Sequence, residues 1–548
     1  MSSSVSLNID QKESEEPDVA PISGTHSFLG LRGHQLNFAV SCFAGVGFLL
    51  FGYDQGVMGS LLTLPAFENT FPGMKASTNA TLQGAVIALY EIGCMMASLS
   101  TIYLGDKLGR LKIMFIGSVI VCIGGALQAC AYTIAHLTVA RIFTGLGTGF
   151  ITSTVPVYQS ECSPAKKRGQ LIMMEGSLIA LGIAISYWID FGFYFVRNDP
   201  NHGDAAWRVP IALQCLFPIL LISTVFYFPE SPRWLMNKGR VEDAKKVFSA
   251  LYDLPVDSRK IQVQINEIQA AIALEKDAAG HGFSIKDLFT QGPARNFHRV
   301  SLACWSQIMQ QITGINLITY YAGTIFESYI GMSPLNSRIL AAANGTEYFL
   351  ASLIGFYTIE RLGRRFLLFW GAISQAICMA ILTGTTYAAG KGNSGAGIAA
   401  AVFLFAFNSC FGVSYLGGTW LLPPELLSLK LRAPGAALST ACNWVFNFMV
   451  VMITPVAFES IGCYTYTIFA AINLLMAPVV FFFYPETKGR SLEEMDIIFN
   501  HTPVWQPWKV VQVAKDLPIM HEQQLDKEGD LYDGEKGDTE HIEVLKEN

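Results

Sequence analysis

The stretch GDKLGRLK, residues 105–112, returns in altered form as ERLGRR, residues 360–365, so that Gly109-Arg110 recurs as Gly363-Arg364. Two further pairs keep the same order and almost the same offset. Glu161 with Arg168 recurs as Glu425 with Arg432, and PESPRW (229–234) recurs as PETKGR (485–490). Repeats this long predict two homologous halves that meet at a shared interface.

Apolar stretches of about 20 residues surround these repeated motifs, which is the length that a helix needs to cross a bilayer. Helices are favoured there because lipid offers no hydrogen bonds to the backbone. We therefore expect an all-α integral membrane protein with 12 transmembrane helices in two pseudo-symmetric six-helix bundles. The expected spans are 37–60, 82–104, 112–132, 135–157, 171–193 and 209–228, then 301–325, 336–358, 366–388, 397–422, 434–456 and 464–484.

The composition agrees with a lipid environment. The chain has 548 residues, of which 51% are hydrophobic and 15% charged, whereas soluble proteins have about 25% charged residues. The net charge is −6, and no basic patch indicates a nucleic-acid partner. The 11 cysteines and nine histidines are scattered without catalytic or metal-binding motifs, so we expect no enzyme, cofactor, catalytic residue or metal site.

Lys and Arg occur in alternate loops, which predicts that those loops and both termini are cytoplasmic. We expect a multi-pass membrane protein, with the lipid bilayer as a partner. The expected domains are a disordered N-tail (1–35), a first bundle (36–228), a helical linker (229–298), a second bundle (299–484) and an acidic C-tail (485–548) that is disordered beyond Phe499.

The opposite face of the membrane carries Asn79-Ala80-Thr81. This sequon makes Asn79 either an N-glycosylation site or an unmodified loop residue. A second sequon at Asn344 lies inside the eighth span, where we expect no glycan.

Charged residues recur in pairs at the cytoplasmic ends of the spans. We expect them to form a latch of ion pairs that closes the inner side and separates when the two halves rock. The alternative is that they only set topology and solubility. The latch residues are Arg110, Glu161, Arg168, Glu360, Arg364, Glu425 and Arg432.

Together, GDKLGR, R-x-x-x-G-x-G-x-G (141–149), PVYQSE, PESPRW, QQITGIN, ERLGRR, NWVFN and PETKGRS resemble the sugar porters of the major facilitator superfamily over residues 36–497. Within that family the chain resembles fungal proton-linked glycerol symporters and hexose or pentose permeases. The resemblance implies the major facilitator fold and monosaccharide transport by alternating access, coupled to protons. It also implies a location in the plasma membrane, with a sugar or polyol and protons as further partners. A glycerol or polyol symporter, a proton-independent facilitator and a non-transporting sugar sensor remain alternatives.

A sugar offers hydroxyl groups and apolar C–H faces, which neutral amides and aromatic rings suit better than charges do. The seventh span supplies amides around Gly314, which interrupts the helix. The resemblance places Gln310, Gln311, Asn316, Trp420, Asn443 and Asn447 on the substrate, with Tyr320 and Tyr321 as the outer gate. Any single amide could instead join two helices.

The chain departs from the family pattern at three places. Glu175-Gly176 stands where a sugar-binding glutamine is usual, Leu416-Gly417 replaces Gly-Pro, and Glu347-Tyr348 occupies a frequent amide position. Glu175 and Glu347 each lie in an apolar span, where a carboxyl group is either structural or functional. These departures leave the substrate preference open.

The first span includes the stretch FLLFGYDQGVMG (48–59), which contains Asp54. A carboxylate at such a depth is expensive and needs a compensating reason. Arg141 in the fourth span is the available counter-charge, and an Asp that meets and leaves an Arg can take up and release a proton. The resemblance implies that this pair couples transport to protons. The alternative is a permanent structural ion pair.

Overall fold

The computed structural model of the protein describes residues 26–164, 167–196, 203–279, 284–292 and 294–517, and within these ranges the secondary structure is helical apart from one isolated bridge between Phe28 and Leu31. The tails expected to be disordered fall largely outside the described residues, namely at 1–25 and 518–548. The all-α fold predicted from the apolar pattern is confirmed.

The first bundle is built from long helices and a few short segments. Its elements are α1 (Gly33–Leu61), α2 (Pro65–Thr70), η1 (Pro72–Met74), α3 (Ala76–Leu108), α4 (Arg110–Ala129), α5 (Ile134–Cys162), α6 (Arg168–Tyr194), α7 (Ala205–Leu213), α8 (Leu216–Thr224) and η3 (Val225–Tyr227).

The second bundle has the same plan. Its elements are α13 (Asn296–Ile312), α14 (Ile315–Thr324), η4 (Ile325–Tyr329), α15 (Pro334–Leu362), α16 (Arg364–Gly390), α17 (Ser394–Leu426), α18 (Leu429–Ile461), η5 (Gly462–Tyr464) and α19 (Thr465–Phe483).

In the described part of the chain, ten helical stretches are long and apolar enough to cross a membrane. One of them, Leu429–Phe483, contains both α18 and α19, and the seventh span is divided into α13 and α14 and so escapes this count. Including these, the described residues supply the 12 spans that the sequence predicts.

Gly314 separates α13 from α14. Its φ is +93°, a left-handed conformation that glycine adopts at little cost. An added Cβ would lie 2.9 Å from the ring of Phe469 and 3.1 Å from Met379. Glycine is therefore required at this break for both backbone and packing reasons.

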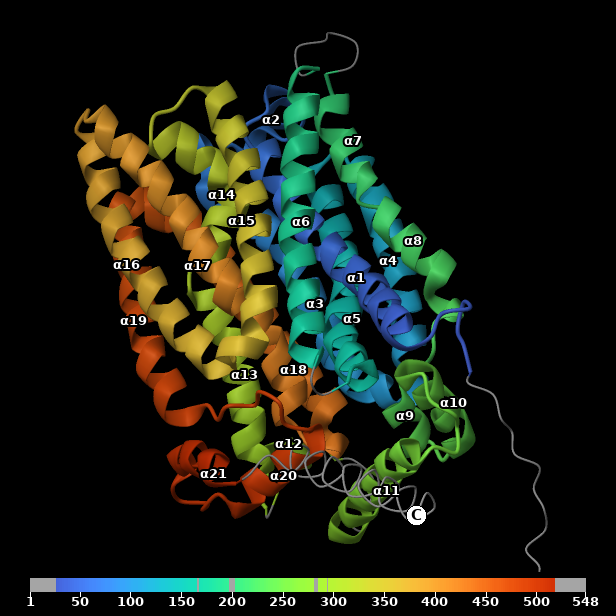
Figure 1. The fold of residues 1–548 in the computed structure, drawn as a ribbon. Coiled ribbons are helices and arrows are strands. Elements are labelled where there is room, and N and C mark those ends of the chain that lie inside the picture. Colours follow the sequence, from blue (N-terminus) through green and yellow to red (C-terminus); the bar gives the residue numbers. More distant parts are fainter. Residues whose placement is uncertain (1–25, 165–166, 197–202, 280–283, 293, 518–548) are drawn as a thin grey trace, which may run out of the picture.

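The two bundles stand side by side, and the helices of the linker and the tail cover one end of them (Figure 1). These are α9 (Pro232–Asn237), α10 (Val241–Tyr252), α11 (Arg259–Ala279) and α12 (Ile285–Phe289) of the linker, with α20 (Leu492–His501), η6 (Pro507–Lys509) and α21 (Val510–Asp516) of the tail. We call this the linker end and the opposite one the outer end. The expectation of disorder directly after Phe499 is wrong, because α21 buries Val510 and Ala514.

Three sets of helices form the interface between the bundles. Helix α3 packs against α18, α6 packs against α15 and α17, and α1 packs against α14. Each set joins a helix of one half to a helix of the other, so residues at the midpoints of these helices meet between the bundles.

Candidate functional site

A cluster of amide side chains lies at the centre of the second bundle. Asn443 on α18 donates through Nδ2 to Gln310 Oε1 at 2.8 Å and to Gln307 Oε1 at 2.6 Å, both on α13. Gln310 donates in turn to the Leu416 carbonyl of α17 at 3.0 Å. These contacts hold three helices in register and fix the direction in which each amide points.

The cluster continues past the helix break. Asn316 on α14 donates to Gln311 Oε1, and Gln311 donates to Gln310 Oε1 at 3.4 Å. Neither amide atom of the buried Asn447 makes a hydrogen bond within the described residues, and Asn443 Oδ1 likewise has no partner there. Buried polar atoms are rarely left unpaired, so these atoms are suited to hydrogen-bond a ligand.

Aromatic side chains from both halves border the amides. The Trp420 ring contacts Phe48 edge-on at a centroid distance of 5.0 Å, and Trp444 contacts Phe51 at 5.0 Å and Tyr90 at 5.9 Å. The indole N–H groups of both tryptophans are buried without a hydrogen-bond acceptor in the described structure. The site therefore combines aromatic faces with unused donors, and its aromatic part is assembled across the interface.

Two of the departures from the family pattern lie against each other. A Cβ added to Gly176 on α6 would approach the Gly417 Cα on α17 to 2.7 Å. A glutamine at position 176 therefore could not be accommodated without separating these helices. At the third departure, Tyr348 is buried and packs against Phe411, while Glu347 accepts a hydrogen bond from Ser409.

Several contacts close the outer end across the two halves. Tyr187 on α6 donates to the Thr319 carbonyl of α14, and Arg338 on α15 donates to Thr63 Oγ1 at 2.6 Å. The Arg338 guanidinium also lies 4.4 Å from the centroid of the Tyr194 ring. Sequence reasoning did not find Arg338, because nothing in its local sequence indicates which helix it meets.

The two predicted gate tyrosines both make hydrogen bonds from α14. Tyr320 Oη donates to Glu91 Oε1 on α3 at 2.9 Å, and Tyr321 Oη donates to the Val451 carbonyl at 3.1 Å. The backbone of Tyr321 leaves helical geometry, with φ −128°. Helix α14 is thus bounded by the break at Gly314 and contains a second irregularity near its other end.

Asp54 and Arg141 are both fully enclosed between the helices of the first bundle. Arg141 acts electrostatically on Asp54, but its guanidinium donates to the Ile87 carbonyl at 3.0 and 3.2 Å. Within the described residues, neither carboxylate oxygen of Asp54 accepts a hydrogen bond. The arrangement is therefore a charge cluster rather than a simple bidentate pair, and Glu91 is part of it.

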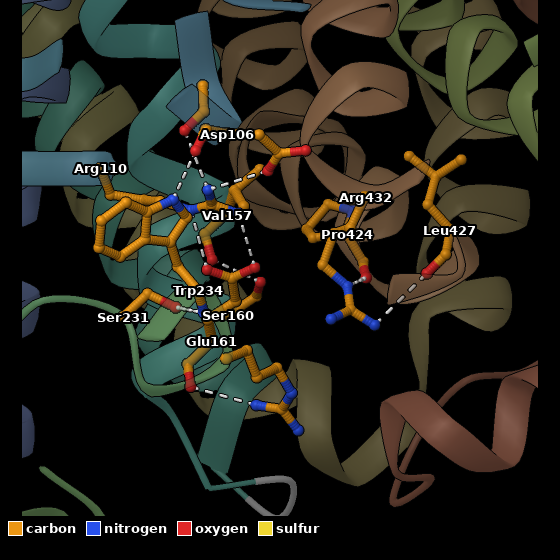
Figure 2. Close-up of polar contacts among 12 residues, drawn as sticks. Asp106, Arg110, Val157, Ser160, Glu161, Ser231, Trp234, Pro424, Leu427 and Arg432 are labelled. Atoms are coloured by element: carbon orange, nitrogen blue, oxygen red, sulfur yellow. Dashed lines mark hydrogen bonds and ion pairs between the residues drawn. The ribbon is translucent and has the colours of Figure 1, made fainter. Parts of the chain in front are cut away.

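At the linker end of the first half, three repeated residues meet. The Arg110 guanidinium donates twice to Glu161, with both distances 3.0 Å, and both side chains are buried (Figure 2). Glu230 accepts from the backbone N–H of Arg110 at 3.1 Å and of Leu111 at 3.3 Å, which caps the first turn of α4. Burial raises the pKa of the Glu230 carboxyl, and these donors act in the opposite direction.

The second half repeats this geometry. Arg364 donates to Glu425 at 3.1 and 3.4 Å and to Glu360 at 2.6 Å. Glu486 accepts from the backbone N–H of Arg364 at 3.0 Å and of Arg365 at 3.1 Å. We call each set of arginine, buried glutamate and capping glutamate a lock. The capping glutamates were visible in the repeated PES and PET motifs, but their role was not predicted.

Both locks join helices within one half rather than across the interface. The contact between halves is made by neighbouring residues. Arg432 of α18 acts electrostatically on Glu161 and donates to the Pro424 carbonyl at 3.2 Å, facing the first lock in Figure 2. At the start of α6, beside the buried Arg168, a Cβ on Gly169 would come within 2.3 Å of Glu360.

Asn79 is exposed near the start of α3, whose other end leads into the linker-end lock at Arg110. Its backbone departs from helical geometry and its Oδ1 accepts from the backbone N–H of Leu82 at 2.9 Å. Asn344, the second sequon residue, is instead buried and accepts from Asn408 at 2.7 Å.

The comparisons with known proteins identify the family. The model of the family described as "Sugar (and other) transporter" matches residues 40–499. The chain is 38% identical to "Sugar transporter STL1" of Saccharomyces cerevisiae, over 91% of this chain and 87% of that protein. It is 29% identical to a "High-affinity glucose transporter" of Kluyveromyces lactis, over 93% and 91% of the two chains.

A solved structure shares the fold. The proton:xylose symporter XylE bound to 6-bromo-6-deoxy-D-glucose superposes with a TM-score of 0.73 at 23% identity, covering 84% of this chain and 99% of that one. The family model matches most of the chain, and the 38% identical relative is matched over most of its length. The chain is a multi-pass membrane transporter that belongs to the sugar (and other) transporter family.

Proposed function

We propose that the amide cluster binds a monosaccharide between the two halves of the protein. The observation that carries this proposal is a set of buried polar atoms that make no hydrogen bond within the described residues. They belong to Asn443, Asn447, Trp420 and Trp444. They include donors and acceptors, and they border the aromatic side chains of both halves. Sugar hydroxyl groups can both donate and accept, and so can satisfy such a mixed set.

The proposed binding roles follow from the geometry. Gln310, Gln311 and Asn316 present amides that are already oriented by one another and by the α17 backbone. Preorganised groups lose little entropy when a ligand binds. Tyr320 and Tyr321 close the outer side of the site because they lie on α14, whose break at Gly314 allows it to move separately from α13.

We propose further that transport is sugar/proton symport by alternating access, with Asp54 and Arg141 in the proton site. A carboxyl group enclosed near a guanidinium responds strongly to small changes in its surroundings. One relative is a sugar transporter, and a solved structure with the same fold is a proton:xylose symporter, which supports this choice over a polyol carrier or an uncoupled facilitator. We place the protein in the plasma membrane with both termini cytoplasmic, and propose that the two locks and Arg432 stabilise the closed linker end.

Uptake of labelled glucose and xylose by cells that lack their own sugar carriers tests the proposal. We expect uptake to be competed by monosaccharides and not by glycerol or a disaccharide, and to be accompanied by alkalinisation of the medium. An uncoupler and the variant Asp54→Asn should each abolish accumulation against a gradient. Uptake that ignores the uncoupler would contradict symport, and competition by glycerol alone would contradict the sugar assignment.

A further inference from the structure

Glu91 is a buried acid of the first bundle that the proposed proton pair leaves unexplained. It lies on α3, is fully enclosed, and accepts the hydrogen bond of Tyr320 at 2.9 Å. Tyr320 follows it by 229 residues and belongs to the other half. Glu91 is therefore the place where the polar interior of the first bundle is joined to the gating helix α14.

The groups that face Glu91 come from every helix packed around it. They are Asp54 from α1, Arg141 from α5, Tyr320 and Tyr321 from α14, and Cys94 from α3 itself. Tyr90 of α3 lies beside Asp54 and Tyr320, and its ring packs against Trp444 of α18. Arg141 lies 5.3 Å from the centroid of the Tyr90 ring.

The charges of this cluster do not balance. Asp54 and Glu91 are two acids, and Arg141 is the guanidinium that acts on both. With both acids ionised, the cluster carries one net negative charge, which is costly when it is enclosed without water. One added proton, shared by the two acids, makes the cluster neutral, and interacting acids of this kind titrate as a pair.

Helix α14 covers this cluster from the outer end. The Tyr320 hydroxyl of α14 reaches Glu91 on α3, and the contacts of Tyr187 and Arg338 hold the same outer end closed. With α14 in this position, Asp54, Glu91 and Arg141 are all buried. The cost of closure therefore depends on whether the cluster holds its proton.

We propose that Glu91 is a second acid of the proton site, and that α14 closes over the substrate only when the Asp54–Glu91–Arg141 cluster has gained one proton from the outer side. Tyr320 keeps its own proton and donates its hydrogen bond to Glu91 in the closed state. On the linker side, loss of that one proton restores the net charge and favours reopening of the outer end. This inference rests on the proposed proton symport.

The variant Glu91→Gln tests this inference, because glutamine keeps an acceptor for Tyr320 but makes the cluster neutral without a proton. The wild-type apparent affinity for sugar should fall by up to about tenfold per pH unit on the alkaline side, since closure binds one proton. Glu91→Gln should vary by less than about twofold over the same range and transport downhill without moving protons. Glu91→Asp should restore the pH dependence.

Two further variants separate a proton role from a structural one. Tyr320→Phe removes the hydrogen bond but keeps both acids, so its pH profile should be displaced to weaker affinity and stay parallel to that of the wild type. Glu347→Gln removes a different acid, on α15 beside Ser409, and should keep the wild-type pH dependence.

The outcomes distinguish this inference from the function on which it rests. If the wild type moves no protons with sugar, proton symport itself is contradicted. If the wild type is coupled and Glu91→Gln remains equally coupled, or loses both net uptake and sugar exchange while folded, the role of Glu91 is overturned. A flat pH profile in Tyr320→Phe would overturn it as well.

Discussion

The two halves are alike at the linker end and different at their centres. Arg110, Glu161 and Glu230 form the same lock as Arg364, Glu425 and Glu486, with the same bidentate pair and the same capped helix start. At mid-depth, however, the first half buries the charged cluster of Asp54, Glu91 and Arg141, whereas the second buries the amide cluster around Gln310 and Asn443.

The two central clusters suit different tasks. Neutral amides can orient hydroxyl groups without paying the desolvation cost of charge, while acids beside an arginine can change protonation. The two halves therefore share one architecture, and their centres differ in the polar groups that they bury. The contact between Tyr320 and Glu91 joins the two specialised regions directly.

The largest expected effect comes from breaking a lock. Glu161→Gln and Glu425→Gln each remove the buried carboxylate of a lock, which costs about 3–5 kcal/mol in other buried pairs. Asp106 remains beside Arg110 and Glu360 beside Arg364. We expect a large loss of thermal stability and of uptake, similar in size for the two variants. The measurements are thermal unfolding of the purified protein and uptake normalised to surface expression.

Asp243→Asn provides the matched control, because Asp243 pairs with Arg240 on the exposed surface of the linker, and such exposed pairs contribute little to stability. A severe effect from one lock and none from the other would show that the repeated geometry hides unequal roles.

The next effect tests the amide centre. Asn447→Ala removes polar atoms that make no hydrogen bond within the described chain, so sugar binding should weaken while folding stability does not fall. Losing one or two ligand hydrogen bonds corresponds to about 1–3 kcal/mol, or about 10- to 100-fold in Kd. Titration of the purified protein with labelled sugar measures this.

Asn473→Ala is the contrasting variant. Asn473 donates to the Thr313 carbonyl at 2.9 Å and so braces the helix break. It should lower stability more than Asn447→Ala does. Unchanged sugar affinity in Asn447→Ala would remove that residue from the binding site.

A smaller effect is expected from the capping glutamates. Glu230→Gln and Glu486→Gln retain an acceptor oxygen but lose its charge, so each should destabilise by about 1 kcal/mol, the usual contribution of a helix cap. Differential scanning calorimetry should show two similar, modest decreases in Tm. A decrease confined to one variant would mean that the symmetry does not extend to the caps.

The smallest effect should come from Asn79→Gln at the outer end. Asn79 is exposed and remote from both centres, so transport kinetics should be unchanged. If the sequon carries a glycan, the variant will migrate faster on a gel. Altered transport in this variant would contradict the view that Asn79 has no part in either half's function.

The sequence predicted what depends on local pattern and on internal repetition. The spans follow from hydrophobic length, and the lock arginines follow from the 105–112 and 360–365 repeat. Glu161 and Glu425 follow from the second repeated pair, with Arg168 and Arg432. Gln307 could have been found too, since it lies three residues before Gln310 and shares its helix face.

The remaining features depend on contacts between distant segments. Glu91 meets Tyr320 across the interface, and Arg338 meets Thr63 from 275 residues away. A single sequence contains no signal for such pairings. The tight approach of Gly176 to Gly417 is likewise invisible until both helices are placed, although it explains why two departures occur together.

The capping glutamates have a consequence for control of the carrier from the linker end. Glu230 stands at the first residues of the linker and Glu486 at the first residues of the tail, and the tail is tied back to the bundle by Arg299 with Asp496 and by Arg295 with the Thr502 carbonyl. A protein that binds the linker or the tail would therefore act on the first turn of α4 or α16. Each lock includes one residue at the start of such a segment, so binding there can reach the membrane helices without contact with the substrate site.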